Sequence, residues 1–181
     1  LLEGPLDKRI ENKWISLVPT QLYRLVTSSI ACENLRKFNG IFIGGSSLSE
    51  KLAQKCRIEE LPLSPCYGMS ETAGMVTLLD PHLFKQGLGG VGRVLSHALL
   101  SVNPVNNRIA VKAKSMCLNP VEEVKAVEQW LSTPDYGYND SDGNWFIQGR
   151  LDRIVVTGGE KVDPHLIEKV IQQFDLVDEC L

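Results

Sequence analysis

The segment "GIFIGGSSLSEKLAQKC", residues 40–56, combines a short apolar run, a glycine-rich turn and an amphipathic helical pattern. The apolar run ends at the pair Gly44–Gly45, where a strand can turn. Ser47 and Glu50 have the spacing of a capping box, which predicts that a helix begins there. The helix would bury one stripe, made of Leu48, Leu52, Ala53 and Cys56. Strand, loop and helix in this order predict a largely parallel sheet with ligands at its strand ends.

The same alternation of strand and helix begins upstream, at residue 14, and stops near Pro81. "WISLVPT" at residues 14–20 is a short apolar run, and "QLYRLV" at residues 21–26 has a helical pattern. Beyond Pro81 the sequence changes to short alternating runs such as "RIAVKA", and "DSDGNWFI" has a hairpin signal at Asp142–Gly143. This part is therefore predicted to be antiparallel β structure.

A third unit starts near Asp152, with a strand, a double-glycine turn and a helix that has Asp163 as its N-cap. The predicted fold class is α/β, in three units. Residues 1–80 form an α/β unit with a parallel sheet, residues 81–151 an antiparallel β unit, and residues 152–181 an incomplete small unit.

Composition excludes several functions. The chain has 181 residues, 43% of them hydrophobic, which is enough for a sizeable core. A net charge of -3 without a long basic run argues against nucleic-acid binding. Five cysteines without a CxxC pair do not suggest a secreted disulfide framework. No apolar stretch approaches the roughly 18 residues of a membrane span. We expect a cytoplasmic protein without a membrane span, and leave homo-oligomer formation open.

Two motifs fail on closer inspection. "GLGGVG", residues 87–92, has the glycine spacing of a dinucleotide-binding loop, but no strand precedes it and no helix pattern follows. "DYGYNDSDGNW" resembles a calcium loop, yet aligning Gly143 with the sixth position places Tyr138 and Gly149 where carboxylates are required. The three histidines have no spacing that predicts a metal site.

"YGMSETAG", residues 67–74, is the strongest candidate for a binding loop. Its glycines allow close approach of a ligand, the Ser70 hydroxyl can donate to a phosphate oxygen, and Glu71 offers the hard oxygen that Mg²⁺ prefers. Taken alone, a polar turn between two core strands explains it equally well. "GGSS" at residues 44–47 is explained by a strand end and a helix cap. "GRLDRIVVTGGEKVDP" at residues 149–164 is harder to explain as a purely structural hairpin, since it adds Arg150 and Asp152 to a glycine pair.

With these motifs in order, the chain resembles the adenylate-forming acyl-CoA synthetase superfamily over nearly its whole length. "FIGGSSLSEKL" resembles the adenine-side strand and loop, and "YGMSETAG" resembles the YGxTE motif with Ser70 in the Thr position. "TPD" at residues 133–135 resembles TGD, with Pro134 in place of the glycine. "GRLDRIVVTGGEKVDPHLIE" resembles the hinge motif between the large and small domains.

The resemblance implies a fold and a site. Residues 1–151 would be the C-terminal part of a large domain, with a parallel α/β layer and a barrel-like β subdomain, and a small α+β domain would begin at 152. The ligands would be ATP, Mg²⁺, coenzyme A and a small carboxylic acid. Ser70 and Glu71 would be catalytic, with Glu71 on the metal, and Asp152 would be the hinge pivot. The remaining binding residues would be Gly44, Gly45, Ser46, Cys66, Tyr67, Gly68, Met69, Asp135, Arg150, Gly158 and Gly159.

Within the superfamily, the texture of several segments is most similar to 2-succinylbenzoate-CoA ligases of menaquinone and phylloquinone synthesis. Other aryl- or fatty-acyl-CoA ligases, carrier-protein adenylation domains and a non-catalytic nucleotide-binding module remain alternatives. The chain lacks counterparts of the Ser/Thr/Gly-rich phosphate loop and of a lysine near the end of the small domain. It starts without Met and stops just after a predicted helix. We therefore expect an inactive C-terminal piece of a longer, active enzyme.

Overall fold

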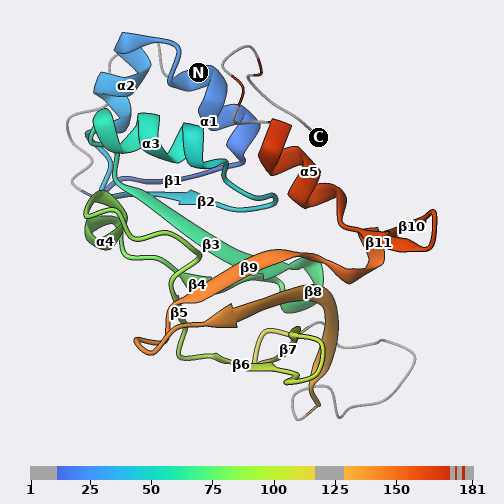
Figure 1. The fold of residues 1–181 in the computed structure, drawn as a ribbon. Helices are drawn as coiled ribbons and strands as arrows, with labels where there is room; N and C mark the ends of the chain where they lie inside the picture. Colours follow the sequence, from blue (N-terminus) through green and yellow to red (C-terminus); the bar gives the residue numbers. More distant parts are fainter. Residues whose placement is uncertain (1–11, 117–128, 172–173, 175–176, 178–181) are drawn as a thin grey trace.

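The computed structural model describes residues 12–116, 129–171, 174 and 177. Figure 1 shows two sheets, one above the other, with a layer of helices on top of the upper sheet. The upper sheet has five strands and the lower one four, and a two-stranded hairpin follows them in the chain. The predicted α/β class, with a parallel layer and a separate antiparallel β part, is confirmed.

The upper sheet has the order β1-β2-β3-β4-β5. Strands β1 (Trp14–Leu17), β2 (Gly40–Ile43) and β3 (Leu63–Met69) pair in parallel. Strands β4 (Gly74–Leu78) and β5 (Arg93–Val94) extend the sheet in antiparallel fashion. A single 3-10 turn, η1 (Ser70–Thr72), joins β3 to β4, so the YGMSETAG segment is a strand, a turn and the start of the next strand.

Helices α1 (Pro19–Leu25), α2 (Ser29–Leu35) and α3 (Glu50–Ile58) lie on the same side of this sheet (Figure 1). Their buried faces pack with β1, β2 and β3 into the first core, which also takes in Phe84 of the short helix α4 (Pro81–Lys85). The predicted stripe of α3 is confirmed for Leu52, Ala53 and Cys56, which are all buried.

The predicted cap of α3 is wrong by two residues. Ser49, not Ser47, is the N-cap, and its hydroxyl accepts a hydrogen bond from the Leu52 N–H at 3.3 Å. The segment contains three serines, at 46, 47 and 49, and the one directly before the first helical residue caps the helix.

The lower sheet is antiparallel and has the order β6-β7-β8-β9. Its strands are β6 (Ala98–Val102), β7 (Arg108–Ala113), β8 (Leu131–Asn139) and β9 (Trp145–Arg150). The predicted alternation of "RIAVKA" is confirmed, because Ile109, Val111 and Ala113 are buried while the residues between them are half-exposed. The predicted hairpin at Asp142–Gly143 is also confirmed, since it joins β8 to β9 and Gly143 has a φ of +81°.

The second core joins the two sheets. Val76 of β4 packs with the inward side chains of the lower sheet, which are Ala98, Ile109, Val111, Ala113 and Trp145. The segment between residues 74 and 94 therefore contributes to both cores: Phe84 belongs to the first core and Val76 to the second. The division of the chain at residues 81 and 152 stays a prediction.

The C-terminal part comprises the 3-10 turn η3 (Leu151–Arg153), the hairpin β10 (Val155–Thr157) and β11 (Glu160–Val162), and helix α5 (Pro164–Ile171). Asp163 caps α5 as predicted, with Oδ1 accepting from the His165 N–H at 2.9 Å. The other oxygen, Oδ2, accepts a hydrogen bond from the Tyr136 hydroxyl of β8. The apolar face of α5 is exposed, with Leu166, Ile167 and Val170 between 49% and 57% accessible.

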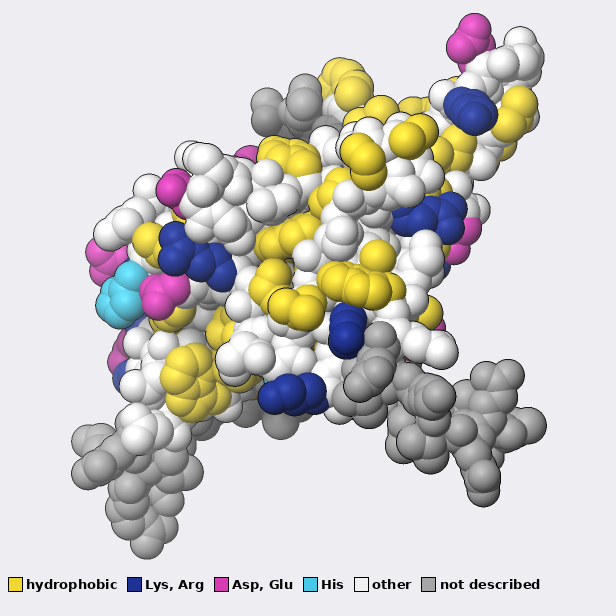
Figure 2. Space-filling model, turned by 90° about the horizontal axis from the view of Figure 1, so that it is seen from below, with side chains coloured by type: hydrophobic (Ala, Val, Ile, Leu, Met, Phe, Trp, Pro, Cys, Tyr) yellow, Lys and Arg dark blue, Asp and Glu magenta, His cyan; other side chains and the backbone are white. Residues whose placement is uncertain are grey.

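The face of the molecule away from the helix layer carries an apolar patch. Figure 2, seen from below, shows these hydrophobic side chains, with Lys and Arg side chains near them. Exposed apolar surface of this kind is typical of a face that contacts another protein segment.

Within the described ranges, no helix has the length and apolar character that crossing a membrane requires.

The GLGGVG segment is a close-packed loop, not a dinucleotide site. A Cβ atom at Gly92 would lie 2.0 Å from the Leu78 carbonyl oxygen, and one at Gly90 would lie 2.5 Å from that of Trp145. Gly92 and Gly90 also have φ values of +72° and +80°, which favour glycine. These glycines let the loop pass directly against both sheets.

Substituting alanine at Gly92 and at Gly87 should therefore have different effects on stability. Both have positive φ, so each substitution should cost about 1 kcal/mol in backbone strain. Apart from its two chain neighbours, no described residue has an atom within 4 Å of a Cβ at Gly87. Gly92→Ala, which must displace backbone, should lower the free energy of unfolding by at least about 2 kcal/mol more than Gly87→Ala. Chemical denaturation measures both, and equal losses would contradict the close-packing explanation.

Candidate active site

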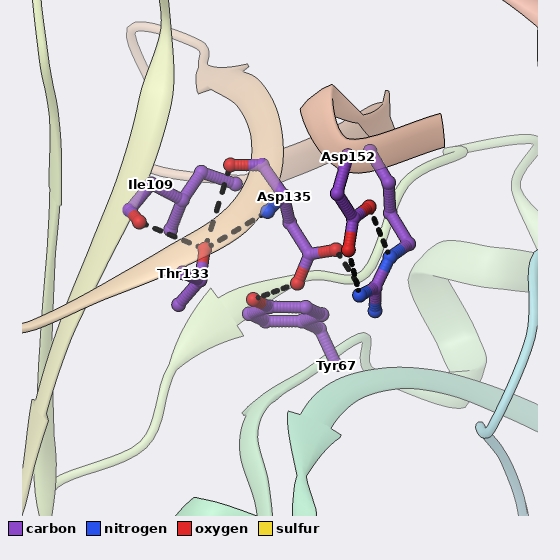
Figure 3. Close-up of polar contacts among 6 residues, drawn as sticks. Tyr67, Ile109, Thr133, Asp135 and Asp152 are labelled. Carbon is purple, nitrogen blue, oxygen red and sulfur yellow. Dashed lines mark hydrogen bonds and ion pairs between the residues drawn. The ribbon is translucent and has the colours of Figure 1, made fainter. Parts of the chain in front are cut away.

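The site forms where β3 of the upper sheet meets β8 of the lower one. The Tyr67 hydroxyl donates a hydrogen bond of 2.6 Å to Asp135 Oδ2, joining residues 68 positions apart in the sequence. Figure 3 shows Tyr67 pointing at the Asp135 carboxylate. Asp135 is 8% exposed, so this carboxylate is nearly buried and needs such partners.

The backbone around Asp135 is held by Thr133. The Thr133 hydroxyl donates to the Ile109 carbonyl at 2.8 Å and accepts the Asp135 N–H at 3.1 Å (Figure 3). Pro134, between them, has no N–H to donate. Thr133 is itself 1% exposed, so it fixes the position of Asp135 from inside the lower sheet.

Arg150 and Asp152 complete this cluster. Arg150 ends β9 directly opposite Asp135, and its Nη1 lies 3.9 Å from Asp135 Oδ1. Arg150 also forms two hydrogen bonds to Asp152, with Nε to Oδ1 at 3.0 Å and Nη2 to Oδ2 at 2.7 Å. The arginine therefore connects the buried carboxylate to the start of the C-terminal part. Its side chain is 49% exposed, which leaves guanidinium surface open to a ligand.

The protonation states follow from these contacts. Burial, and then the hydrogen bond to Asp135, raise the pKa of Tyr67 above its usual value, so the phenol stays a neutral donor. The hydrogen bonds from Arg150 lower the pKa of Asp152 below its ordinary value of 3.8. The same pair raises the pKa of Arg150. Near neutral pH, Asp152 is therefore an anion and Arg150 a cation.

Ser70 and Glu71 lie one turn beyond Tyr67, in η1. Both are exposed, whereas Thr72 beside them is 1% accessible. Gly68 is needed at this place, because a Cβ there would lie 2.1 Å from the Gly74 carbonyl oxygen. Ala73 closes the turn in a left-handed conformation, with a φ of +52°. The turn presents a hydroxyl and a carboxylate to solvent on a fixed backbone.

The residues predicted to lie beside the adenine are found along the same strand. The Cys66 Sγ lies 3.3 Å from the Ile43 carbonyl oxygen, and a Cβ at Gly44 would be 3.0 Å from this sulfur. Gly45 has a φ of +85°, and both it and Ser46 are exposed. Burial raises the pKa of the Cys66 thiol, so it is a packing group and not a ready nucleophile.

Gly158 and Gly159 are not brought to this cluster. They form the turn between β10 and β11, with φ values of +58° and +86°. Figure 1 shows this hairpin projecting to the side of β8 and β9. The described part of the chain places no atom outside their chain neighbours within 4 Å of a Cβ at either glycine.

Two residues with a role in the site were not foreseen from the sequence. The Thr72 hydroxyl lies inside the η1 turn, and Ser115 donates from beyond β7 to the Thr72 carbonyl at 2.6 Å. Thr72 directly follows Glu71, and this adjacency is the only signal in the sequence that could have identified it. No spacing in the sequence connects Ser115 to it.

The rejected metal motif is explained by its own hydrogen bonds. Asp140 Oδ1 accepts the N–H groups of Asp142 and Asn144 at 3.0 Å and 2.8 Å, which closes the hairpin turn. Within the described ranges, no three His, Cys, Asp or Glu residues are grouped in a way that could hold a metal. A metal at Glu71 would therefore need ligands from water or substrate.

The arrangement of the two sheets is that of the adenylate-forming CoA ligases that the motifs resemble, and the comparisons agree with this family. No family model matches the chain. In sequence and fold, however, the chain is similar to a C-terminal portion of adenylate-forming CoA ligases, which confirms the resemblance of its motifs.

Among the individual relatives is a protein named 2-succinylbenzoate–CoA ligase from Listeria monocytogenes. It is 30% identical over 172 residues, which is 91% of this chain and 36% of the relative. A Drosophila melanogaster protein named long-chain-fatty-acid–CoA ligase heimdall is 30% identical over 82% of this chain and 22% of its own length. The chain thus spans about a third or less of these relatives.

The solved structures include o-succinylbenzoate CoA synthetase (MenE) from Bacillus subtilis in complex with the acyl-adenylate intermediate OSB-AMP. Its TM-score is 0.75 at 26% identity, over 94% of this chain and 38% of that one. The same enzyme in complex with ATP and magnesium ion has a TM-score of 0.74 at 26% identity, over 93% of this chain and 38% of that one.

Removing the Tyr67 hydroxyl should destabilise the protein, because Asp135 would lose its partner at Oδ2 while staying nearly buried. Tyr67→Phe should lower the free energy of unfolding by about 1–3 kcal/mol. Tyr138→Phe is the matched control, since Tyr138 is 46% exposed and its ring stacks on Phe146. The control should change stability by less than about 0.5 kcal/mol. Equal values in denaturant titrations would show that the Tyr67–Asp135 bond contributes nothing.

Proposed function

We propose that the full-length protein containing this chain is an ATP-dependent carboxylate–CoA ligase that acts through an acyl-adenylate. The strongest support is that one strand, β3, lies between a cluster that could bind a ribose and a turn that could bind a phosphate. At β3, Tyr67 contacts the Asp135–Arg150 pair, and the turn that follows presents Ser70 and Glu71. A ribose and a phosphate of one nucleotide could be held by these groups at the same time.

The ribose would be held by Asp135 and Arg150. Tyr67 occupies Asp135 Oδ2, so Oδ1 is the oxygen free to accept a ribose hydroxyl. Arg150, half-exposed beside it, can donate to the sugar from the opposite strand. The adenine would lie along Gly44, Gly45, Ser46 and the residues 66–69 of β3.

Ser70 and Glu71 would act at the α-phosphate. The Ser70 hydroxyl can donate to a phosphate oxygen, and Glu71 can bind Mg²⁺. A single exposed carboxylate fits this metal, which is held through one or two carboxylates with substrate phosphates and water. When bound, Mg²⁺ supplies positive charge that offsets charge building up on the phosphates.

The reaction would need no nucleophile from the protein. A carboxylate oxygen of the substrate attacks the α-phosphorus of ATP, and pyrophosphate leaves. The thiol of coenzyme A then loses its proton to solvent, its sulfur attacks the acyl carbon, and AMP leaves with the bonding electrons. The protein contributes positioning and charge neutralisation. The raised pKa of Cys66 is consistent with this division of roles.

The C-terminal part would serve the second step. Asp152 would be the pivot, because Arg150 binds it at the junction between β9 and η3. Gly158 and Gly159 would border the path of the coenzyme A thiol, as a turn with no side chains to obstruct it. Their distance from the Tyr67 cluster is consistent with a rearrangement between the two steps.

For the substrate we propose 2-succinylbenzoate, which would place the protein in menaquinone or phylloquinone synthesis. The support is the similarity to bacterial proteins named for this reaction. The alternative is another aryl- or fatty-acyl-CoA ligase, favoured by the equal identity to the Drosophila protein. A non-catalytic nucleotide-binding module is the candidate from a different class. A cytoplasmic location stays a prediction, and homo-oligomer formation stays open.

The first test is carboxylate-dependent AMP formation by the full-length protein with ATP, Mg²⁺ and coenzyme A. We expect 2-succinylbenzoate to be preferred over benzoate and medium-chain fatty acids. Preference for another acid would keep the mechanism and discard the pathway, and nucleotide binding without turnover would support the module. The 181-residue chain alone should be inactive, since it lacks the phosphate loop and the lysine. Carboxylate-dependent AMP release by this chain would refute that.

Glu71→Gln tests the metal role. It should lower the adenylation rate about 100-fold, because a neutral amide replaces the anionic ligand at the phosphate. Thermal stability should stay unchanged, since Glu71 is exposed. Glu60→Gln, at another exposed glutamate, is the control. Unchanged pyrophosphate release by the Glu71 variant would remove this residue from the mechanism.

A further inference from the structure

The η1 turn holds its two exposed residues through a buried neighbour. Thr72 is 1% accessible, and its hydroxyl accepts the Met69 N–H at 3.1 Å. The same oxygen lies 2.9 Å from the Met69 carbonyl and 2.7 Å from the Gly74 carbonyl, and can donate to one of them at a time. Thr72 thereby ties the two ends of the turn together.

Ser115 holds this turn from the other sheet. It follows β7, and its hydroxyl donates to the Thr72 carbonyl oxygen at 2.6 Å, across 43 residues of sequence. Thr72 is thus fixed by its side chain within the upper sheet and by its carbonyl group from the lower one. The carbonyl group that accepts this hydrogen bond belongs to Thr72, which directly follows Glu71 in the chain.

The exposed residues have no such support of their own. Among the described residues, no hydrogen bond or ion pair fixes the side chain of Ser70 or of Glu71, and both are solvent-accessible. Their positions depend on the backbone of the turn. That backbone includes Ala73 in the left-handed region, which surrounding contacts must maintain.

We propose that Ser115 is a positioning residue for Glu71, acting through the Thr72 carbonyl group. The inference rests on the proposed function of Glu71 as the Mg²⁺ ligand. Groups that orient a metal ligand without touching the metal affect metal affinity or activity by about 10- to 100-fold. Ser115 belongs to the antiparallel part of the chain, so this part would help to set the geometry of a loop in the parallel part.

The test is the Mg²⁺ dependence of AMP formation by the full-length protein. Ser115→Ala should raise the Mg²⁺ concentration for half-maximal rate about tenfold, because Glu71 is no longer held in place. The KM for the carboxylate should not change. Ser115→Thr, which keeps the hydroxyl, should restore the wild-type curve. Ser101→Ala, at an exposed serine of β6, is the matched control and should behave as wild type.

A second measurement does not depend on activity. The Ala73 N–H donates to the Ser70 carbonyl at 3.0 Å and closes the turn. Its hydrogen exchange should be about tenfold faster in Ser115→Ala than in the wild type, and unchanged in Ser115→Thr and Ser101→Ala. Unaltered exchange, or a rate loss without a shift in the Mg²⁺ curve, would overturn the proposal.

The two measurements separate this inference from the proposed function. If the wild-type protein forms no AMP with any carboxylate, the ligase proposal fails and the positioning role for catalysis fails with it, whatever the exchange shows. If the wild type is active and Ser115→Ala changes neither the Mg²⁺ curve nor the exchange, the positioning role alone fails.

Discussion

The hydrogen bond between Tyr67 and Asp135 is the contact on which the rest of the site depends. It joins the last part of β3 to β8, and so connects the upper sheet to the lower one at a nearly buried carboxylate. A carboxylate in such a place is costly unless it has partners, and here they are a phenol, a backbone held by Thr133, and Arg150. Because these partners come from different strands, the site exists only when both sheets are assembled.

The local features of the sequence were predicted well because each depends on neighbouring residues. The alternation of "RIAVKA", the hairpin at Asp142–Gly143 and the Asp163 cap follow from side-chain period, turn chemistry and capping. The cap at Ser49 was missed because three serines precede the helix and each could have capped it. The contacts of Thr72 with Ser115 and of Tyr67 with Asp135 span 43 and 68 residues, and no local rule pairs such positions.

The glycines also show what the sequence alone cannot predict. The spacing in GLGGVG is that of a nucleotide loop, while in the fold Gly90 and Gly92 make room for carbonyl groups of the two sheets. In "YGMSETAG", Gly68 likewise makes room for the backbone of β4. A glycine in a motif indicates either a positive φ or a close approach of the backbone to another group. Where the backbone is closely approached, the tertiary structure decides whether the approaching group is a ligand or another strand.

The two oxygens of Asp163 have separate partners, and this has a consequence for how the C-terminal part can move. Oδ1 caps α5 internally, while Oδ2 accepts from Tyr136 of β8. Breaking the contact with Tyr136 leaves the cap in place, so detachment does not unwind the first turn of the helix. The hinge rearrangement proposed above would therefore cost one hydrogen bond at Asp163, but not the cap at the start of α5.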